Sequence, residues 1–215
     1  MKSKFDAQKI NDLLAALDIA FPQAHCELDF KSAYQLLIAV ILSAQCTDKR
    51  VNAVTPALFE FCPTAEETAK KSEEDIIPYI KSCGFYNNKA KSIINCSRQI
   101  VEEYGGEVPR DRDVLEKLAG VGRKTANVVY SEAFGGQAIA VDTHVFRVSN
   151  RLGLVDAKTP EETEKQLMAI IPREEWSRTH HRLIFLGRYQ CSARSPKCED
   201  CAVKDYCKHY AEKGE

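Results

Sequence analysis

The sequence lacks any apolar run long enough to cross a membrane. The longest, residues 36–42, is about a third of the roughly 20 residues that a membrane helix needs. The N-terminal segment, residues 1–6, has basic residues but no apolar stretch behind them, so it is not a secretory signal. We therefore expect a protein that has no membrane span and stays in the cytoplasm.

An excess of charge of one sign is also missing. The chain has 30 Lys and Arg against 31 Asp and Glu, a formal net charge of -1 and a pI near 6.5. The net charge therefore does not indicate nucleic-acid binding, and any surface that binds a polyanion must be a local patch of basic residues. With 215 residues and 44% hydrophobic content, the chain can fill the core of one large or two modest domains.

Strand patterns are almost absent. The only candidate, residues 138–141, is four residues long and has no partner of similar character. Helical patterns recur instead, and the pattern of residues 34–44 predicts a helix that is apolar on nearly every side. We predict an all-α chain of about ten short helices. Start signals stand at Thr64, Ser72 and Thr159, and stop signals stand at Gly84, Gly105 and Gly135.

The nine cysteines divide into two groups. A reducing cytoplasm disfavours a disulfide framework and leaves metal binding, catalysis or plain burial. Four cysteines follow a Cys-x6-Cys-x2-Cys-x5-Cys spacing, and four thiolates suit a tetrahedral zinc ion as readily as a 4Fe-4S cluster. These four are Cys191, Cys198, Cys201 and Cys207, whereas the single Cys26, Cys46, Cys62, Cys83 and Cys96 are expected to be small buried hydrophobes.

A glycine-rich turn lies between a helix capped by Asp111 and a second helix that begins near Arg123. Gly120 and Gly122 flank Val121 and allow a tight turn whose N–H groups meet the positive end of the second helix. Such a turn can hold one DNA phosphate. A simple helix connector would use the same residues, so the pattern alone is a weak signal.

Two segments carry a family resemblance. Residues 118–126 strongly resemble the helix-hairpin-helix of the endonuclease III family of DNA glycosylases, and residues 141–148 resemble the aspartate-bearing loop and helix that follow it there. The family usually has proline where this chain has Ala119, which affects the stiffness of the turn. The resemblance continues through residues 42–48 and 84–90 and so covers nearly the whole chain.

The resemblance implies a two-domain helix-hairpin-helix DNA glycosylase fold. A helical barrel domain would span residues 27–135, and an iron-sulfur cluster domain would combine residues 1–26 and 136–215. It also implies a 4Fe-4S cluster on Cys191, Cys198, Cys201 and Cys207. The partner would be double-stranded DNA with damaged bases or abasic sites, bound by a monomer that associates with the nucleoid if the source is bacterial.

The resemblance makes Lys124 the nucleophile that attacks the sugar C1′ of a damaged nucleotide. An amine attacks only when neutral, and at an ordinary pKa of about 10.4 roughly one lysine in a few thousand is neutral at pH 7. Asp142 would position the ammonium, accept its proton and offset positive charge on the sugar. From the residues alone, a surface lysine and a helix-capping aspartate are the usual interpretation.

The remaining implied contacts are with DNA. Gln45 and Phe85 would enter the base stack where the damaged base leaves, although a core Phe and a helix-end Gln are ordinary too. Residues 176–198 contain five basic residues and no acid, which also favours DNA contact. His144 either orients the site or packs. The predicted phosphate contacts are Gly120, Val121, Gly122, Arg123, Arg194 and Lys197.

The implied activity is that of a bifunctional DNA glycosylase/AP lyase of base excision repair. It would remove oxidised pyrimidines and cleave abasic sites by β-elimination. A monofunctional mismatch DNA glycosylase and a non-catalytic protein that binds damaged DNA are the alternatives. Lys124 favours the first, because mismatch glycosylases generally lack an amine at this position.

Overall fold

A computed structural model describes residues 5–212. This part of the chain contains twelve α-helices and no strand, and residues 138–141 are extended without pairing. The expected all-α fold is therefore confirmed, with two helices more than the approximate number predicted. None of these helices combines the length and apolar character that a membrane crossing requires.

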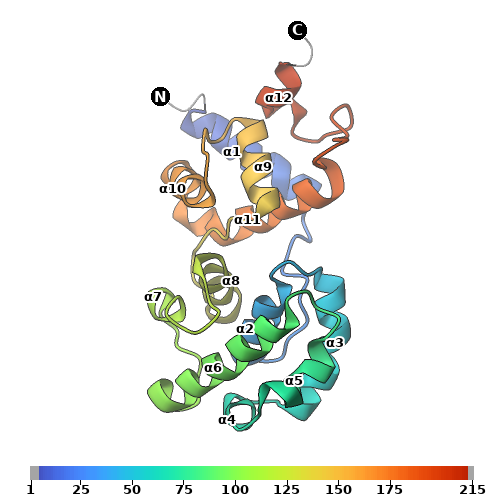
Figure 1. Cartoon of the computed structure of the whole chain (residues 1–215). Helices are drawn as coiled ribbons and strands as arrows, with labels where there is room; N and C mark the ends of the chain where they lie inside the picture. The colour runs from blue at the N-terminus through green and yellow to red at the C-terminus, as the bar shows by residue number, and fades with distance from the viewer. Residues whose placement is uncertain (1–4, 213–215) are drawn as a thin grey trace. The chain divides into compact units, whose positions relative to one another are not determined.

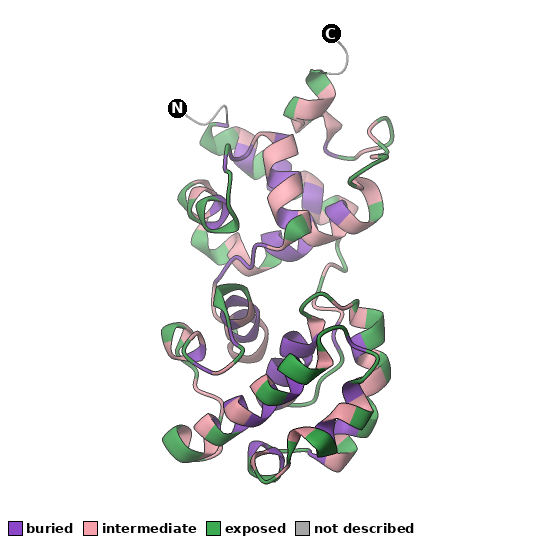
Figure 2. Cartoon of the chain, viewed as in Figure 1, coloured by how far each residue is buried: buried purple, intermediate pink, exposed green. Residues whose placement is uncertain are grey.

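One compact unit comprises Glu27–Gly136. Its centre is α2 (Ala33–Ser43), which has buried residues on every side, as its uniformly apolar sequence predicts. Helices α3, α6 and α8 pack against it (Figures 1 and 2). The other helices of this unit are α3 (Asp48–Phe61), α4 (Ala65–Ala69), α5 (Glu73–Ile80), α6 (Tyr86–Tyr104), α7 (Arg112–Leu115) and α8 (Arg123–Phe134).

Most of the predicted helix boundaries in the chain are confirmed. Thr64 and Thr159 cap α4 and α10, and Ser72 forms a full capping box at the start of α5. Gly105 and Gly135 end α6 and α8 in the left-handed conformation. The stop predicted at Gly84 is wrong, because α5 already ends at Ile80 and Gly84 lies in the turn that leads into α6.

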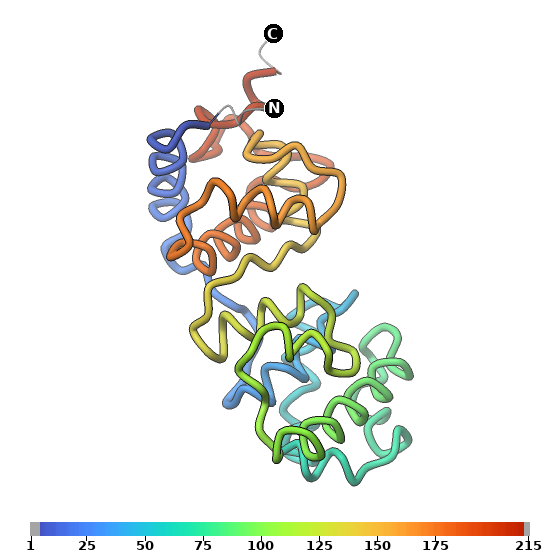
Figure 3. Tube along the Cα trace, turned by 90° about the vertical axis from the view of Figure 1, so that its left-hand side faces the viewer, coloured from blue at the N-terminus to red at the C-terminus, as the bar shows by residue number. Residues whose placement is uncertain are grey.

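The second unit combines the N-terminal segment up to Cys26 with the chain from Gln137 onward. Helix α1 packs against α11, so the two ends of the sequence share one hydrophobic core (Figures 1 and 3). A π-helical turn, Leu186–Gln190, continues α11. The helices are α1 (Ala7–Ala20), α9 (Thr143–Leu152), α10 (Pro160–Ile170), α11 (Trp176–Phe185) and α12 (Lys208–Ala211).

The limits of these units match the expected domains except at residue 136, which belongs to the Glu27–Gly136 unit and was expected in the other domain. That each unit is an independent domain stays a prediction.

The prediction that the five single cysteines are buried is wrong in part. Cys62, Cys83 and Cys96 are buried, but Cys26 and Cys46 are partly exposed.

Candidate functional site

The glycine turn is built as the sequence suggests. Asp111 caps α7 by accepting hydrogen bonds from the N–H groups of Asp113 and Val114. Gly120 has a φ of +76°, and a Cβ there would lie 2.5 Å from Cβ of Ser92. Only glycine fits this position without displacing the backbone or the neighbouring helix. Val121 is buried and anchors the turn.

The turn leads directly into α8, whose N-terminus has no capping side chain. Gly122 is the N-cap of α8 and offers no capping side chain, and a Cβ on it would meet nothing within 4 Å. Gly122, Arg123 and Lys124 are all exposed. The first N–H groups of α8 therefore face solvent at the positive end of the helix dipole, an arrangement that suits an anionic phosphate.

Two side chains hold this hairpin in place. Nε of Arg112 donates to Oδ1 of Asn127 at 2.8 Å and ties α7 to α8. The backbone N–H of Ala119 donates to Oε1 of Gln99 at 2.7 Å. A proline at this position would have no N–H to donate. The departure from the family pattern at Ala119 is thus accompanied by a hydrogen bond that α6 supplies.

Asp142 is the N-cap of α9 in the second unit. Its Oδ1 accepts hydrogen bonds from the N–H groups of His144 and Val145, each at 2.8 Å. Within the described residues, Oδ2 of Asp142 accepts no hydrogen bond, so it is available to a ligand. The capping interpretation is therefore correct for Asp142, and one carboxylate oxygen still remains for chemistry.

Gln45 and Phe85 share an uncommon backbone conformation. They are the only non-glycine residues with positive φ in the described chain, at 52° and 57°. Both side chains are exposed, and Phe85 retains 63% of its accessible surface. Left-handed backbone costs an L-residue about 1–2 kcal/mol, and such strain concentrates at functional sites. Phe85 is not a core residue, so the structural alternative for it is wrong.

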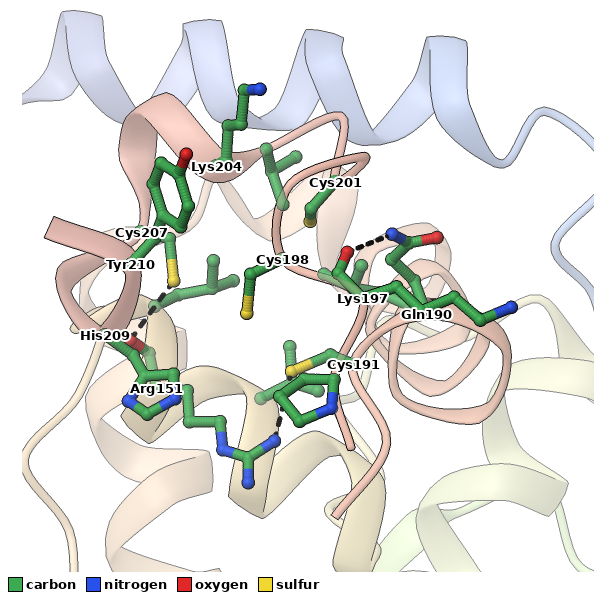
Figure 4. A pocket seen from close by; sticks show the side chains of 15 residues that line it. Arg151, Gln190, Cys191, Lys197, Cys198, Cys201, Lys204, Cys207, His209 and Tyr210 are labelled. Atoms are coloured by element: carbon green, nitrogen blue, oxygen red, sulfur yellow. Dashed lines mark hydrogen bonds between the residues drawn. The ribbon is translucent and has the colours of Figure 1, made fainter. Parts of the chain in front are cut away.

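The four C-terminal cysteines line one pocket beside α9 and α12 (Figure 4). Burial raises the pKa of the Cys201 and Cys207 thiols, and the neighbouring cysteines add to this rise. Among residues 5–212, no three His, Cys, Asp or Glu side chains converge closely enough to hold a single metal ion. Four cysteine thiols that line one pocket are the donor set that a 4Fe-4S cluster requires, so the residues present fit this group.

Sequence reasoning missed two arginines of α9 that hold the cysteine loop. Nη2 of Arg147 donates to the carbonyl oxygens of Gly187 and Cys191, at 2.9 and 3.0 Å. Nη1 of Arg151 donates to Sγ of Cys191 at 3.4 Å and to the carbonyl of Ser192 at 2.7 Å. The signal was present in the sequence, because residues four apart on a helix share a face.

The other predicted DNA contacts have different surroundings. Arg194 and Lys197 are exposed on the cysteine loop. His144 packs against Gly187, where a Cβ would lie 2.8 Å from that of His144. The expected DNA contact of the basic residues in 176–198 is wrong for Arg182, which is 5% exposed and pairs with Asp18 of α1. Its charge stabilises the fold.

Comparisons with known proteins agree with this geometry. Residues 38–173 match the model of the HhH-GPD superfamily of base excision DNA repair proteins, and residues 191–207 match the iron-sulfur binding domain of endonuclease III. Endonuclease III of Bacillus subtilis (strain 168) is 53% identical over 206 residues, which cover 95% of this chain and 91% of the relative. The chain belongs to the endonuclease III family.

The chain is also similar to solved structures, and these include complexes of endonuclease III with DNA. One, described as "Structure of a Trapped Endonuclease III-DNA Covalent Intermediate: Estranged-Adenine Complex", has a TM-score of 0.93 and 50% identity, and covers 98% of this chain and 100% of its own. A thermostable thymine-DNA glycosylase is less similar, with a TM-score of 0.84, 25% identity, and coverage of 96% and 100%. The chain is a base excision repair DNA glycosylase with AP lyase activity and carries a 4Fe-4S cluster.

Proposed function

We propose that this enzyme removes oxidised pyrimidines from double-stranded DNA, as a monomer, and then cleaves the abasic site through a Schiff base on Lys124. The observation that carries the proposal is the exposed position of Lys124 at the second residue of α8, directly behind an open helix N-terminus. A phosphate bound by the N–H groups there would bring a sugar within reach of the amine.

In the first step Nζ of Lys124 forms a bond to C1′, and the bond from C1′ to the base breaks. The departing base takes the bonding electron pair and is protonated. Asp142 accepts the proton that the amine loses and offsets the positive charge on the sugar through Oδ2. The bond from C1′ to the ring oxygen O4′ then breaks and O4′ takes up a proton, which leaves an imine on C1′. The imine acidifies the C2′ proton, whose loss expels the 3′ phosphate by β-elimination.

The other predicted residues act on DNA position. The turn formed by Gly120, Val121, Gly122 and Arg123 binds a backbone phosphate. Gln45 and Phe85 fill the space that the extruded nucleotide vacates, which offsets part of the few kcal/mol that extrusion costs. Arg194 and Lys197 contact the phosphate backbone of the DNA, and His144 supports the loop that bears Asp142.

Cys191, Cys198, Cys201 and Cys207 are the proposed cluster ligands. They are all the cysteines of the segment that matches the iron-sulfur domain, and they line a single pocket. The cluster, when bound, cross-links the loop that carries Arg194 and Lys197 and supplies no step of base removal. Iron and sulfide analysis of a Cys198→Ala variant tests the assignment, since loss of a ligand should lower the iron content.

Borohydride trapping tests the catalytic proposal. Wild-type protein mixed with duplexes that contain thymine glycol, another oxidised pyrimidine or an abasic site should form a covalent complex after reduction. Lys124→Ala should form none, whereas Lys117→Ala, an exposed lysine seven residues earlier, should behave as wild type. A trapped complex with Lys124→Ala would overturn the assignment. Base release without trapping by the wild type would favour the mismatch glycosylase alternative.

A further inference from the structure

Two cysteines outside the cluster flank the residues proposed to enter the DNA stack. Cys46 directly follows Gln45, and Cys83 is separated from Phe85 by Gly84 alone. The carbonyl oxygen of Gln45 lies 3.5 Å from the place that a Cβ on Gly84 would occupy, so the two chain segments lie next to each other. Both segments belong to the Glu27–Gly136 unit.

The two thiols also interact with each other. Burial, together with the hydrogen bond and charge of the Cys46 side chain, raises the pKa of Cys83 to about 11, although Lys89 and Arg50 act in the opposite direction. Cys83 is 1% exposed, whereas Cys46 is partly open to solvent. One thiol of the pair is thus accessible to a reagent, and its neighbour is shielded.

A buried lysine lies against this pair. Lys89 is 5% exposed, and its Nζ donates to the carbonyl oxygen of Leu42 at 2.8 Å, at the C-terminal end of α2. Burial lowers the pKa of Lys89, and the nearby Cys46 and Cys83 thiols counteract this shift. A thiol that is partly open to solvent, as Cys46 is, can be reached by an oxidant.

We propose that Cys46 and Cys83 form a redox-sensitive dithiol, which a hydroperoxide oxidises to a disulfide across the segments that carry Gln45 and Phe85. The Cys46 sulfur attacks the hydroperoxide and the O–O bond breaks. A sulfenic acid forms, and the other oxygen leaves as water or, from an organic hydroperoxide, as an alcohol. The Cys83 sulfur then forms the S–S bond and displaces the sulfenic hydroxyl, which leaves as water. Two thiols lose two electrons and two protons, and the hydroperoxide is reduced by two electrons.

The consequence for DNA rests on the proposed function of Gln45 and Phe85. An S–S bond of about 2.05 Å is shorter than any contact between two thiols, so oxidation draws the two segments together. Displacements of about 1 Å at a positioning residue can cost a hundredfold in rate. The disulfide therefore slows the processing of damaged DNA, and reduction restores it. Because reducing surroundings keep such pairs as thiols, the switch responds to oxidation alone.

Peptide mapping tests the bond directly. Trypsin places Cys46 in the peptide of residues 32–49 and Cys83 in the peptide of residues 82–89, and neither peptide holds another cysteine. After brief treatment of the cluster-containing protein with hydrogen peroxide and blocking of remaining thiols, we expect these peptides joined, with two hydrogens lost. Dithiothreitol should separate them. Failure to find them joined while Cys46 is oxidised to sulfinic acid would overturn the proposal, as would unmodified thiols at both positions.

Kinetics test the consequence, with Cys83→Ser and Cys96→Ser as matched variants. Peroxide should slow strand cleavage of abasic DNA at least about fivefold for wild type and Cys96→Ser, and leave Cys83→Ser unchanged. Equal slowing of all three proteins would overturn the coupling. If the reduced wild type fails to trap DNA at all, the proposed function fails while the peptide result stands by itself, so the two failures are distinguishable.

Discussion

Arg151 donates from Nη1 to Sγ of Cys191 at 3.4 Å, and the same guanidinium donates to the carbonyl oxygens of Ser192 and Ala193, each at 2.7 Å. One side chain of α9 thus holds both the first cysteine of the cluster segment and the backbone that follows it. Hydrogen-bond donors to metal-ligating residues orient these residues and slow the loss of the metal.

Replacement of Arg151 should therefore destabilise the iron-sulfur site. Arg151→Met keeps the length of the side chain and removes its donors, and we expect the cluster to be lost about tenfold faster under air. Decay of the visible absorption band measures the rate. Arg178→Met is the matched control, because Arg178 is exposed on α11 and its ion pairs with Asp18 and Glu175 are long, at 3.7 and 3.8 Å. Equal decay rates in the two variants would contradict the role of Arg151.

The two functions of Asp142 can be separated. Asp142→Asn keeps Oδ1 as an acceptor for the N–H groups of His144 and Val145, so the free energy of unfolding should stay close to that of the wild type. Asp142→Ala loses the cap and should cost about 1 kcal/mol. Both should reduce the rate of borohydride trapping at least a hundredfold, because neither retains a carboxylate. A fully active Asp142→Asn would rule out proton transfer to this residue.

The two hairpin glycines should differ in their sensitivity. Gly120→Ala forces a side chain into positive φ and against Ser92, and should lower the free energy of unfolding by about 2 kcal/mol or more. Gly122→Ala, with φ of -91° and open space around it, should cost less than about 1 kcal/mol. It should still weaken binding to duplex DNA, because the methyl group projects where a phosphate approaches. Urea unfolding and fluorescence anisotropy measure the two effects.

Phe85 should trade stability for function. Phe85→Gly relieves left-handed strain and removes a side chain that is 63% exposed, so the free energy of unfolding should rise by up to about 1 kcal/mol. The affinity for a lesion-containing duplex should fall, since nothing replaces the stacked ring. Phe85→Leu, which keeps an apolar wedge but also the strain, is the control. If Phe85→Gly lowers both the free energy of unfolding and the affinity for the lesion-containing duplex, the role of Phe85 is structural.

Alkaline pH should destabilise the protein in part through Cys96. Burial raises the pKa of this thiol from 9.0 to about 12 in the folded chain. Above pH 9 the unfolded chain releases a proton that the folded chain retains, so the free energy of unfolding falls as the pH rises. By pH 10 this contribution is about 1.4 kcal/mol. Cys96→Ala should show a shallower fall between pH 8 and pH 10 in urea unfolding, and Cys26→Ala, at a partly exposed position, should not.

Local chemistry explains which predictions held. Helix starts at Thr64 and Ser72 and the end at Gly105 depend on a hydrogen bond or a φ angle set within a few residues, and these were predicted correctly. Arg182 was misassigned because its partner, Asp18, is 164 residues away in sequence. No local pattern reports a pairing of this kind.

The sequence by itself determined the helical class, the cysteine spacing and the motifs that mark Lys124 and Asp142, because each rests on short-range periodicity or on residue chemistry. Only the tertiary structure decided that Ala119 binds Gln99 and that Arg151 holds Cys191. It also brought the segment that carries Cys46 next to the segment that carries Cys83. These contacts join segments at least 20 residues apart in sequence, and the packing of the helices within each unit brings them together.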